Sequence, residues 1–286
     1  MRLSTSTGDI ASRLGLEKSI EVLAAAGYDC IDFSQCAEEI YGADLSKAYF
    51  TELRKFAEDK GVTFNQSHAP FASSFKDEEK TKKRFTEITE AIKRASYLGV
   101  KNIVVHPCQH MTYSEVGVPE LLFEYNMEFY SRLIPYCEEY GIRVAVENMW
   151  QRTGMINHST CSRAEEFVRY IDELNNDCFV ACLDIGHAAL VREDLADFIK
   201  KLGNKRLQCL HVHDVDGTND SHTLPYYGNV EWNKVMKALA DIDYKGDLTF
   251  EATGFLGNVP AELCADGERF MASVGRRLID MYNSNK

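Results

Sequence analysis

Short runs of apolar and β-branched residues alternate along the chain with longer amphipathic stretches. The short runs predict eight strands, at residues 3–7, 30–34, 62–68, 102–107, 143–148, 179–184, 207–213 and 247–252. Between them the apolar residues recur with helical spacing, most clearly over residues 44–61 and 78–99. A glycine lies just before four of the strands, as is typical of helix C-termini: Gly27, Gly61, Gly99 and Gly141.

This regular alternation predicts parallel strands that are joined by helices. An eight-stranded (β/α) barrel of the TIM type fits best, and a doubly wound open sheet is the alternative. The length of 286 residues suits one barrel, and no low-complexity segment or Pro/Gly/Ser-rich linker divides the chain. We therefore expect a single domain over residues 1–286.

Imidazoles and carboxylates occupy the C-terminal ends of the predicted strands. In a (β/α) barrel these ends meet at one rim, where the active groups of such enzymes lie. Six consecutive strands, beginning with 62–68, end in such side chains or closely precede them. The residues are His68, His106, Glu147, Asp184, His187, His211, His213, Asp220, His222 and Glu251. A single strand-end histidine is usually structural, but the alignment of six strands favours a functional site.

The residue types at this rim are typical of a divalent metal site. Mixed carboxylate and imidazole ligands suit Mn²⁺, Zn²⁺, Co²⁺, Fe²⁺ or Mg²⁺, and the lack of cysteine at these positions disfavours soft metals and iron–sulfur clusters. Glu147 and Glu251 are the only strand-end glutamates, and we expect them on different sides of the barrel mouth. One carboxylate can then remove a proton beside a carbonyl and the other can return one, as an aldose–ketose isomerase or sugar epimerase requires.

Aromatic residues just beyond the strand ends are candidates for substrate contacts. They are Phe71, Trp150, Tyr226, Tyr227 and Phe255. Such rings can wall a pocket against the apolar face of a sugar, or they can simply pack the loops. The sequence leaves both interpretations open.

Composition and charge narrow the class of partner. The net charge of −12 argues against nonspecific attraction to nucleic acid or to an anionic membrane, although a local basic patch is compatible with it. No apolar run is long enough for a transmembrane helix, and the N-terminus lacks the features of a signal peptide. Nine scattered cysteines without a CxxC pair indicate a reducing compartment. We therefore expect a cytoplasmic protein that acts on a small molecule, alone or as a homo-oligomer.

The strand-end motifs together resemble one family, the xylose isomerase-like TIM-barrel superfamily. The motifs are SHAPF, VVHP, VENMW, CLDIGHA, LHVHDVDG with NDSH, and TFEAT, and their order and spacing match over roughly residues 1 to 280. That family includes sugar phosphate isomerases and epimerases, ketose 3-epimerases, inosose dehydratases and endonuclease IV. The resemblance implies a metal-dependent enzyme and leaves the sugar, its phosphorylation and the reaction type open.

In the epimerase branch, the resemblance implies a specific role for each rim residue. One metal is held by Glu147, Asp184, His211 and Glu251, and the two glutamates also move the proton. His211 is chosen over His213 because the family's metal histidine precedes an acidic residue by three positions, here Asp214. The resemblance makes His187 a substrate contact, and with one metal we expect the same of the remaining strand-end histidines and two aromatics, His68, His106, His222, Phe71 and Trp150. The epimerases also carry an arginine six residues beyond the metal histidine, where this chain has Gly217.

The endonuclease IV branch implies a different use of the same residues. Its three-zinc site uses nine ligands, and this chain has a candidate for each: His68, His106, Glu147, Asp184, His187, His211, Asp220, His222 and Glu251. In that case the protein is a zinc phosphodiesterase on abasic DNA, and more than one ion is bound. A third alternative is a non-catalytic, metal-containing sugar-binding or complex subunit. Of the three, we favour the sugar or sugar-phosphate isomerase or epimerase.

Overall fold

Eight parallel strands form the centre of the structure, a computed structural model that describes residues 1–36, 45–153 and 156–286. The strands are β1 (Leu3–Ser6), β2 (Cys30–Ser34), β3 (Thr63–His68), β4 (Asn102–Val105), β5 (Arg143–Glu147), β8 (Phe179–Asp184), β9 (Leu207–His211) and β10 (Leu248–Phe250). Their order in the sheet is β10-β1-β2-β3-β4-β5-β8-β9, and every described pair is parallel.

The sheet closes on itself between β9 and β10. Val212, directly after β9, forms a parallel bridge with Phe250. The Val212 amide donates to the carbonyl of Thr249 at 2.8 Å, and the Glu251 amide donates to the carbonyl of Val212 at 3.1 Å. The predicted (β/α)₈ barrel is therefore confirmed. The open-sheet alternative is wrong because β9 and β10, the two ends of the sheet order, meet.

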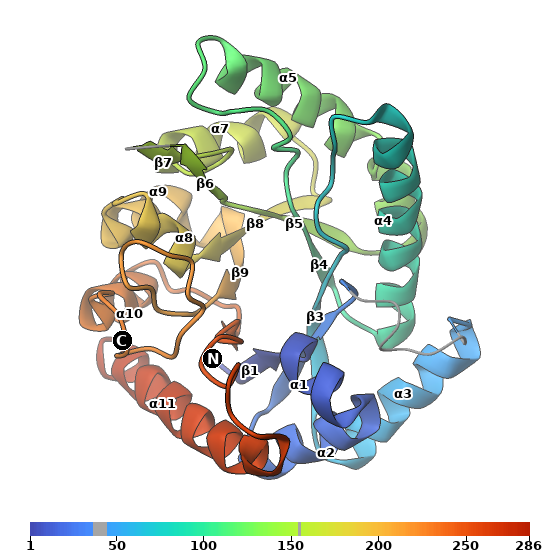
Figure 1. Ribbon diagram of the computed structural model, residues 1–286, viewed down its shortest axis with the longest axis vertical. Coiled ribbons are helices and arrows are strands. Elements are labelled where there is room, and N and C mark those ends of the chain that lie inside the picture. Colours follow the sequence, from blue (N-terminus) through green and yellow to red (C-terminus); the bar gives the residue numbers. More distant parts are fainter. Residues whose placement is uncertain (37–44, 154–155) are drawn as a thin grey trace.

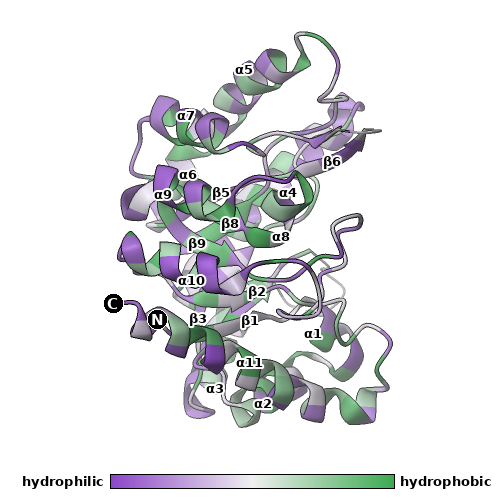
Figure 2. Ribbon diagram, turned by 90° about the vertical axis from the view of Figure 1, so that its left-hand side faces the viewer, coloured by the Kyte–Doolittle hydropathy of each residue, from purple (hydrophilic) through white to green (hydrophobic). Residues whose placement is uncertain are grey.

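Helices surround the ring of strands (Figure 1). They are α1 (Gly8–Leu14), α2 (Leu16–Ala26), α3 (Lys47–Asp59), α4 (Glu78–Leu98), α5 (Val118–Ser131), α6 (Ile134–Tyr140), α7 (Ala164–Leu174), α8 (Ile185–Leu190), α9 (Leu195–Arg206), α10 (Trp232–Asp241) and α11 (Cys264–Ser284). A 3₁₀ turn, η2 (Ala261–Leu263), precedes α11. In Figure 2 strands β5 and β8 are largely hydrophobic, whereas α9 and α10 carry hydrophilic stretches. None of the described helices has the length and apolar content needed to span a bilayer.

The helix boundaries follow the predicted signals. The predicted helix at 78–99 is α4, where Asp77 accepts hydrogen bonds from the first-turn amides and Gly99 ends the helix with a φ of 78°. The predicted helix at 44–61 is shorter, because Ser46 caps α3 at its start and Asp59 is its last residue. Residue 44 lies outside the described residues.

Several features of the C-terminal rim differ from the prediction. The strands predicted over 102–107 and 247–252 end at Val105 and Phe250, so His106 and Glu251 lie just beyond them. The strand predicted over 207–213 ends at His211, so His213 already belongs to the following loop. A short antiparallel hairpin, β6 (Trp150–Thr153) and β7 (Ile156–His158), follows β5 where the sequence pattern predicts no strand. These differences arise at strand ends, where the chain leaves the sheet and side-chain contacts decide its path.

The inside of the barrel is packed with small apolar side chains. Val104, Ala145, Val180, Cys182 and Cys209 form a buried cluster contributed by β4, β5, β8 and β9. A second, larger cluster fills the space between the strands and the helices. Because this packing closes the barrel centre, a small molecule can reach the barrel only from its two ends.

Candidate metal centre

The predicted rim residues gather around one cavity at the C-terminal end of the barrel. The cavity has a volume of about 420 Å³. Its lining residues are Cys36, His68, Phe71, His106, Gln109, Glu147, Met149, Trp150, Gln151, Arg152, His187, Asp220, His222 and Glu251. All six residues predicted to contact substrate are in this wall, as are both glutamates. Asp184 and His211 do not line it, because each is fully buried beneath it.

Four of these side chains form the centre of the site. The ligand atoms of Glu147, Asp184, His211 and Glu251 all lie within 4.8 Å of one another. His211 Nδ1 is 3.4 Å from Glu147 Oε1 and 3.3 Å from Glu251 Oε2. Glu147 is the last residue of β5 and Glu251 directly follows β10, and the carboxylates of both contact the same nitrogen of His211. This is the set of residues that the family resemblance implies as metal ligands.

His68 at the end of β3 and His106 directly after β4 lie against the other oxygen of Glu147. His106 Nε2 is 3.2 Å from Glu147 Oε2, and His68 Nε2 is 3.6 Å from the same atom. The two imidazole rings meet edge to face, with centroids 4.6 Å apart. Ligand atoms of His68, Glu147 and His211 also lie within 4.8 Å of one another, so these three residues form a second possible ligand group.

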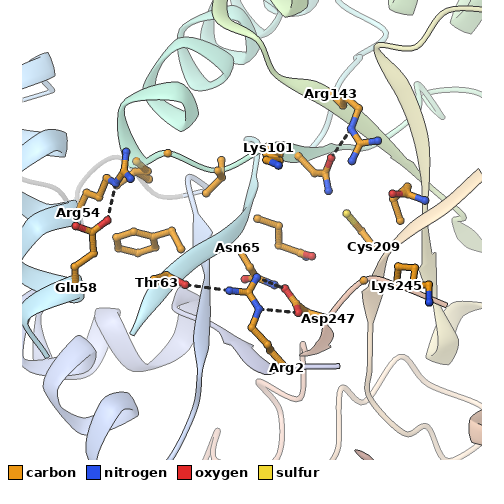
Figure 3. A pocket seen from close by; sticks show the side chains of 18 residues that line it. Arg2, Arg54, Glu58, Thr63, Asn65, Lys101, Arg143, Cys209, Lys245 and Asp247 are labelled. Atoms are coloured by element: carbon orange, nitrogen blue, oxygen red, sulfur yellow. Dashed lines mark hydrogen bonds and ion pairs between the residues drawn. The ribbon is translucent and has the colours of Figure 1, made fainter. Parts of the chain in front are cut away.

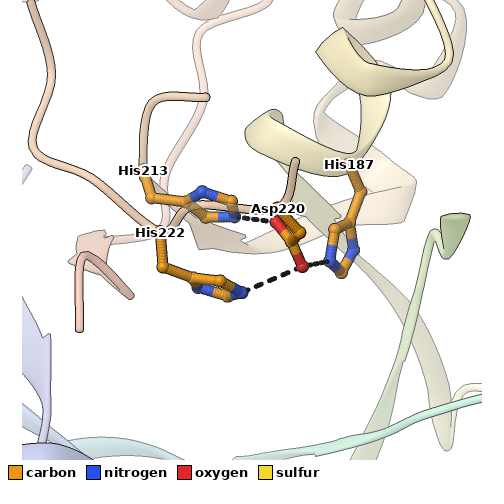
Figure 4. Close-up of side chains that lie close together, drawn as sticks. All are labelled: His187, His213, Asp220 and His222. Carbon is orange, nitrogen blue, oxygen red and sulfur yellow. Dashed lines mark hydrogen bonds and ion pairs between the residues drawn. The ribbon is translucent and has the colours of Figure 1, made fainter. Parts of the chain in front are cut away.

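A third group of side chains surrounds Asp220 (Figure 4). Asp220 Oδ2 is 3.1 Å from His187 Nε2 and 3.0 Å from His222 Nε2. The indole Nε1 of Trp150 donates to the same oxygen at 3.0 Å. The His222 ring stacks on His213, with centroids 4.1 Å apart. The loop that follows β9 therefore brings its own imidazole–carboxylate cluster to the rim beside the four-residue centre.

His211 and His213 have different surroundings. Both ring nitrogens of His211 are buried without a hydrogen-bond partner among the described residues. In contrast, His213 Nε2 lies 3.0 Å from each carboxylate oxygen of Asp184, so its ring supports that carboxylate. The fit is tight, because a Cβ atom at Gly186 would overlap the His213 ring, which explains the glycine in CLDIGHA.

Asp184 is positioned by its neighbours as well as by its strand. It caps the start of α8, where its Oδ1 accepts a hydrogen bond from the His187 amide at 2.6 Å. The Asn148 side chain donates to the Asp184 carbonyl at 2.9 Å and accepts from the Asp184 amide at 2.7 Å. The sequence motifs VENMW and CLDIGHA are thus joined by a pair of hydrogen bonds that fix the backbone of Asp184.

The donor atoms of the site fit a divalent cation. Several buried polar atoms have no hydrogen-bond partner in the part of the chain that the structure describes: His68 Nε2, His106 Nδ1, Glu147 Oε2, both nitrogens of His211 and Asp220 Oδ1. A buried polar atom left unpaired costs about 1–3 kcal/mol, so their gathering in one place calls for a ligand that accepts lone pairs. Burial by itself raises the pKa of the Glu147 carboxyl, but His211 and His106 bring it well below its usual range. The carboxylate is therefore ionised, as metal binding requires.

The structure adds residues to the site that the sequence did not single out. Asp32 on β2 is buried, with its Oδ2 3.6 Å from His211 Nε2. The Sγ of Cys36 lies 3.3 Å from His68 Nδ1. Asp32 carried a usable signal, since it is an acid inside the apolar strand CIDFS. Tyr226, Tyr227 and Phe255 are not in the cavity wall, and the last two pack against each other instead, with centroids 5.1 Å apart.

Comparison of the sequence with known proteins identifies a family and individual relatives. The sequence profile of the family described as "Xylose isomerase-like TIM barrel" matches residues 20–271. The uncharacterized protein MJ1311 of Methanocaldococcus jannaschii is 30% identical over 241 residues, which cover 82% of this chain and 78% of that protein. Fructoselysine 3-epimerase of Shigella flexneri is 23% identical over 266 residues, 91% of this chain and 94% of the enzyme.

A solved structure extends the comparison to three dimensions. The crystal structure of the IOLI protein with a binding zinc atom superposes with a TM-score of 0.81 at 18% sequence identity. The match covers 100% of this chain and 99% of that chain. At this level of identity the likeness shows the shared barrel fold.

Proposed function

The chain belongs to the xylose isomerase-like TIM-barrel family, and we propose that within it the protein is a metal-dependent sugar or sugar-phosphate isomerase or epimerase. The observation that carries the proposal is the convergence of Glu147, Asp184, His211 and Glu251 within 4.8 Å beneath a cavity of about 420 Å³. A sugar 3-epimerase among the relatives, aligned over 91% of this chain, supports the same reaction class.

These four residues would hold the ion through carboxylate and imidazole atoms. Such a set suits Mn²⁺, Zn²⁺, Co²⁺, Fe²⁺ or Mg²⁺. When bound there, such an ion would polarise a carbonyl or hydroxyl oxygen and so would lower the cost of removing the neighbouring C–H proton. Asn148 and His213 orient Asp184, so the protein contributes a prepared set of ligands rather than four independent side chains.

The two glutamates supply the proton transfers. One carboxylate removes the proton from the carbon beside the carbonyl, and the C–H bonding electrons move toward the carbonyl oxygen. For epimerisation the other glutamate, in its acid form, returns a proton to the opposite face of that carbon. Proton exchange with water then restores both side chains. Glu147 ends β5 and Glu251 directly follows β10, and their ligand atoms lie within 4.8 Å of each other, which suits this two-base scheme.

The cavity wall supplies contacts for a polyol. Its imidazoles come from four histidines at the rim, and Gln109, Gln151 and Arg152 add further donors. Phe71 is 52% exposed, and its ring meets His106 edge to face at 4.8 Å, so it offers an apolar surface for a sugar.

The chain has another arginine in place of the one that the epimerases carry six residues beyond the metal histidine. An arginine at that position is disfavoured here, since Gly217 has a φ of 82°. Arg152 lies in the cavity wall, and its guanidinium donates to the backbone carbonyl of Thr218, the next residue of the same loop. We therefore assign Arg152 to the sugar's polar groups.

Solvent exchange tests the proposed chemistry. In D₂O, a screen of ketohexoses, ketopentoses and their phosphates is expected to give a substrate that takes up deuterium at one carbon beside the carbonyl. The physical reason is that the glutamate that returns the proton has exchanged its own proton with D₂O beforehand, so the carbon receives deuterium in place of the hydrogen that the other glutamate removed. NMR or mass spectrometry of the product measures the label.

Three results of this experiment would contradict the proposal. Turnover without solvent deuterium would indicate an intramolecular hydride shift instead of proton transfer. Absence of turnover with any sugar, together with cleavage of a phosphate ester, would favour the alternative of a phosphodiesterase. A metal-loaded protein that binds a sugar without converting it would point to a non-catalytic subunit.

The phosphodiesterase is retained as a second candidate because of one specific observation. Nine residues that resemble the endonuclease IV ligands gather at the rim: His68, His106, Glu147, Asp184, His187, His211, Asp220, His222 and Glu251. The groups around His68 and around Asp220 each have the composition of a further metal site. The number of bound ions therefore separates the two functions.

For the sugar enzyme, we expect about one metal ion per chain in protein purified without chelators. His106→Asn is then expected to leave the metal content near normal while it lowers turnover, because His106 contacts substrate rather than the ion. Elemental analysis by mass spectrometry measures the ion content of both proteins. Loss of one equivalent in His106→Asn, or more than one ion per wild-type chain, would show additional sites. Protein that contains no metal after growth and soaking in metal would remove the basis of the proposal.

A further inference from the structure

A second cavity lies at the opposite, N-terminal end of the barrel (Figure 3). Its volume is also about 420 Å³. It is lined by residues of β3, by the first residues of β4, β5 and β9, by part of α3 and the end of α4, and by the residues just before β1, β4 and β10. The proposed reaction does not use this cavity, because all of its catalytic and binding groups lie at the C-terminal rim.

The wall of this cavity is basic in a protein that is otherwise strongly acidic. Five of its side chains are cationic, namely Arg2, Arg54, Lys101, Arg143 and Lys245, and two are carboxylates, Glu58 and Asp247. The net charge of the whole chain is −12. A concave surface with a low-dielectric wall concentrates the field of its charges, so this end of the barrel attracts anions.

Three of the cations are already paired with carboxylates. Arg2 binds Asp247 through two hydrogen bonds, of 3.1 and 2.8 Å. Arg54 Nε binds Glu58 at 2.8 Å, and Lys245 binds Asp243 at 2.6 Å. Among the described residues, these pairs leave no carboxylate in the cavity wall to balance the remaining two cations.

Lys101 and Arg143 are the two cations of the wall that have no carboxylate partner in the described parts of the chain. Lys101 forms no ion pair or side-chain hydrogen bond with any residue that the structure describes. Arg143 uses only its Nε, which donates to the Asn102 side chain at 3.0 Å, so its two terminal nitrogens stay available. Lys101 directly precedes β4 and Arg143 begins the adjacent strand β5, and the Arg143 amide donates to the Lys101 carbonyl at 2.8 Å. Figure 3 shows both side chains in the cavity wall.

We propose that this N-terminal cavity binds a phosphate group, either of inorganic phosphate or of a small phosphorylated molecule. The unused edge of the Arg143 guanidinium offers two parallel donors that match two phosphate oxygens, and Lys101 adds a mobile ammonium. Two unit charges balance a dianion. The cavity is larger than one phosphate ion, and Phe64, Leu98 and Val100 provide apolar wall for the rest of a ligand. The proposal is independent of the reaction at the other end of the barrel.

Titration calorimetry of the metal-loaded protein tests this site, with inorganic phosphate and a phosphate monoester such as glycerol 3-phosphate as probes at constant ionic strength. We expect saturable binding to the wild type. Arg143→Gln is expected to weaken it about tenfold to a hundredfold, because a charge-assisted hydrogen-bonding partner is lost. Lys101→Gln with Arg143→Gln should abolish it, and Arg143→Lys should give an intermediate affinity, since the charge remains but the fork is lost.

A matched control removes the same charges elsewhere. Lys80→Gln with Arg277→Gln changes one exposed lysine and one exposed arginine outside the cavity, and it should bind phosphate like the wild type. Tighter binding of the monoester than of phosphate would identify a phosphorylated small molecule as the ligand, and equal binding would identify the free ion.

Three outcomes would overturn the proposal. The first is the absence of saturable binding to the wild type, and the second is an equal loss of binding in the cavity and control variants. The third is unchanged binding in the cavity variants, which would place phosphate at the metal centre. Lys101→Gln alone alters an exposed side chain, so it tests the site even if the double variant unfolds.

Discussion

Glu147→Gln is expected to lower turnover by about 10²–10⁴-fold, the range typical of losing a catalytic base or acid. Glutamine keeps the shape of the side chain but cannot take up or release the proton. Glu147 is 1% exposed, and its two oxygens lie 3.4 Å from His211 Nδ1 and 3.2 Å from His106 Nε2. The variant therefore changes the chemistry of a carboxylate that is held in place by its neighbours. Glu251→Gln is expected to have an effect of the same size.

Both variants must be compared at equal metal content, because the same carboxylates are proposed as ligands. Steady-state kinetics with bound ion measured in each sample provides this comparison. Glu268→Gln is a suitable control, since Glu268 is also a buried glutamate, hydrogen-bonded to Tyr28 and outside the wall of the C-terminal cavity. It should retain the wild-type turnover. If the metal-loaded Glu147→Gln or Glu251→Gln variant exchanges deuterium at the wild-type rate, the two-glutamate scheme is wrong.

His211→Asn is expected to remove most of the bound metal, with a larger loss of affinity than His213→Asn. His211 is proposed as a direct ligand, and both of its ring nitrogens are buried without a hydrogen-bond partner among the described residues. His213 instead supports Asp184 through contacts of 3.0 Å. Loss of a residue that orients a ligand typically lowers metal affinity about 10–100-fold, which is the change we expect for His213→Asn.

Competition with a fluorescent chelator measures both affinities on one scale. Circular dichroism of the two variants controls for unfolding, because each histidine is completely buried. If His213→Asn lost the ion while His211→Asn kept it, the assignment of the strand-end histidine would be incorrect. Equal losses would indicate that both rings bind metal, as expected if the cluster around Asp220 holds a second ion.

The fold can be predicted from the sequence because it depends on local and repeated signals. The strands CIDFS and FVACLD have the bounds that their apolar runs predict, and α4 begins after Asp77 and ends before Gly99 as its caps require. The alternation of such elements allows few arrangements, and the right-handed crossover makes a closed barrel the natural one. The sequence does not predict the hairpin of β6 and β7, whose strands are too short to show an apolar period.

The candidate site can be predicted for a related reason. Parallel strands in a barrel all end at the same rim, so a strand-end position alone brings residues such as His68 and Glu147 together. No such rule applies to Cys36 or Asp32, and their contacts with His68 and His211 depend on where the chain runs after β2 and on the packing of that strand. The basic cavity could not be predicted either. Lys101 precedes one strand and Arg143 begins the next, and the apolar residues that predict these strands do not indicate that the two cations line one cavity.

The sequence by itself determined the barrel fold, the parallel direction of its strands, and the imidazoles and carboxylates at one end. These features follow from the apolar periodicity of each segment and from the order of the segments along the chain, and both can be read from the sequence. Only the tertiary structure decided which partner each of those side chains contacts. It separated His211 from His213, because the strand ends between them and the second ring turns onto Asp184. It also placed Lys101 and Arg143 where neither has a carboxylate partner among the described residues. Such distinctions depend on distances of a few ångströms between segments far apart in the chain, and these are set by packing and by the path of each loop rather than by residue type.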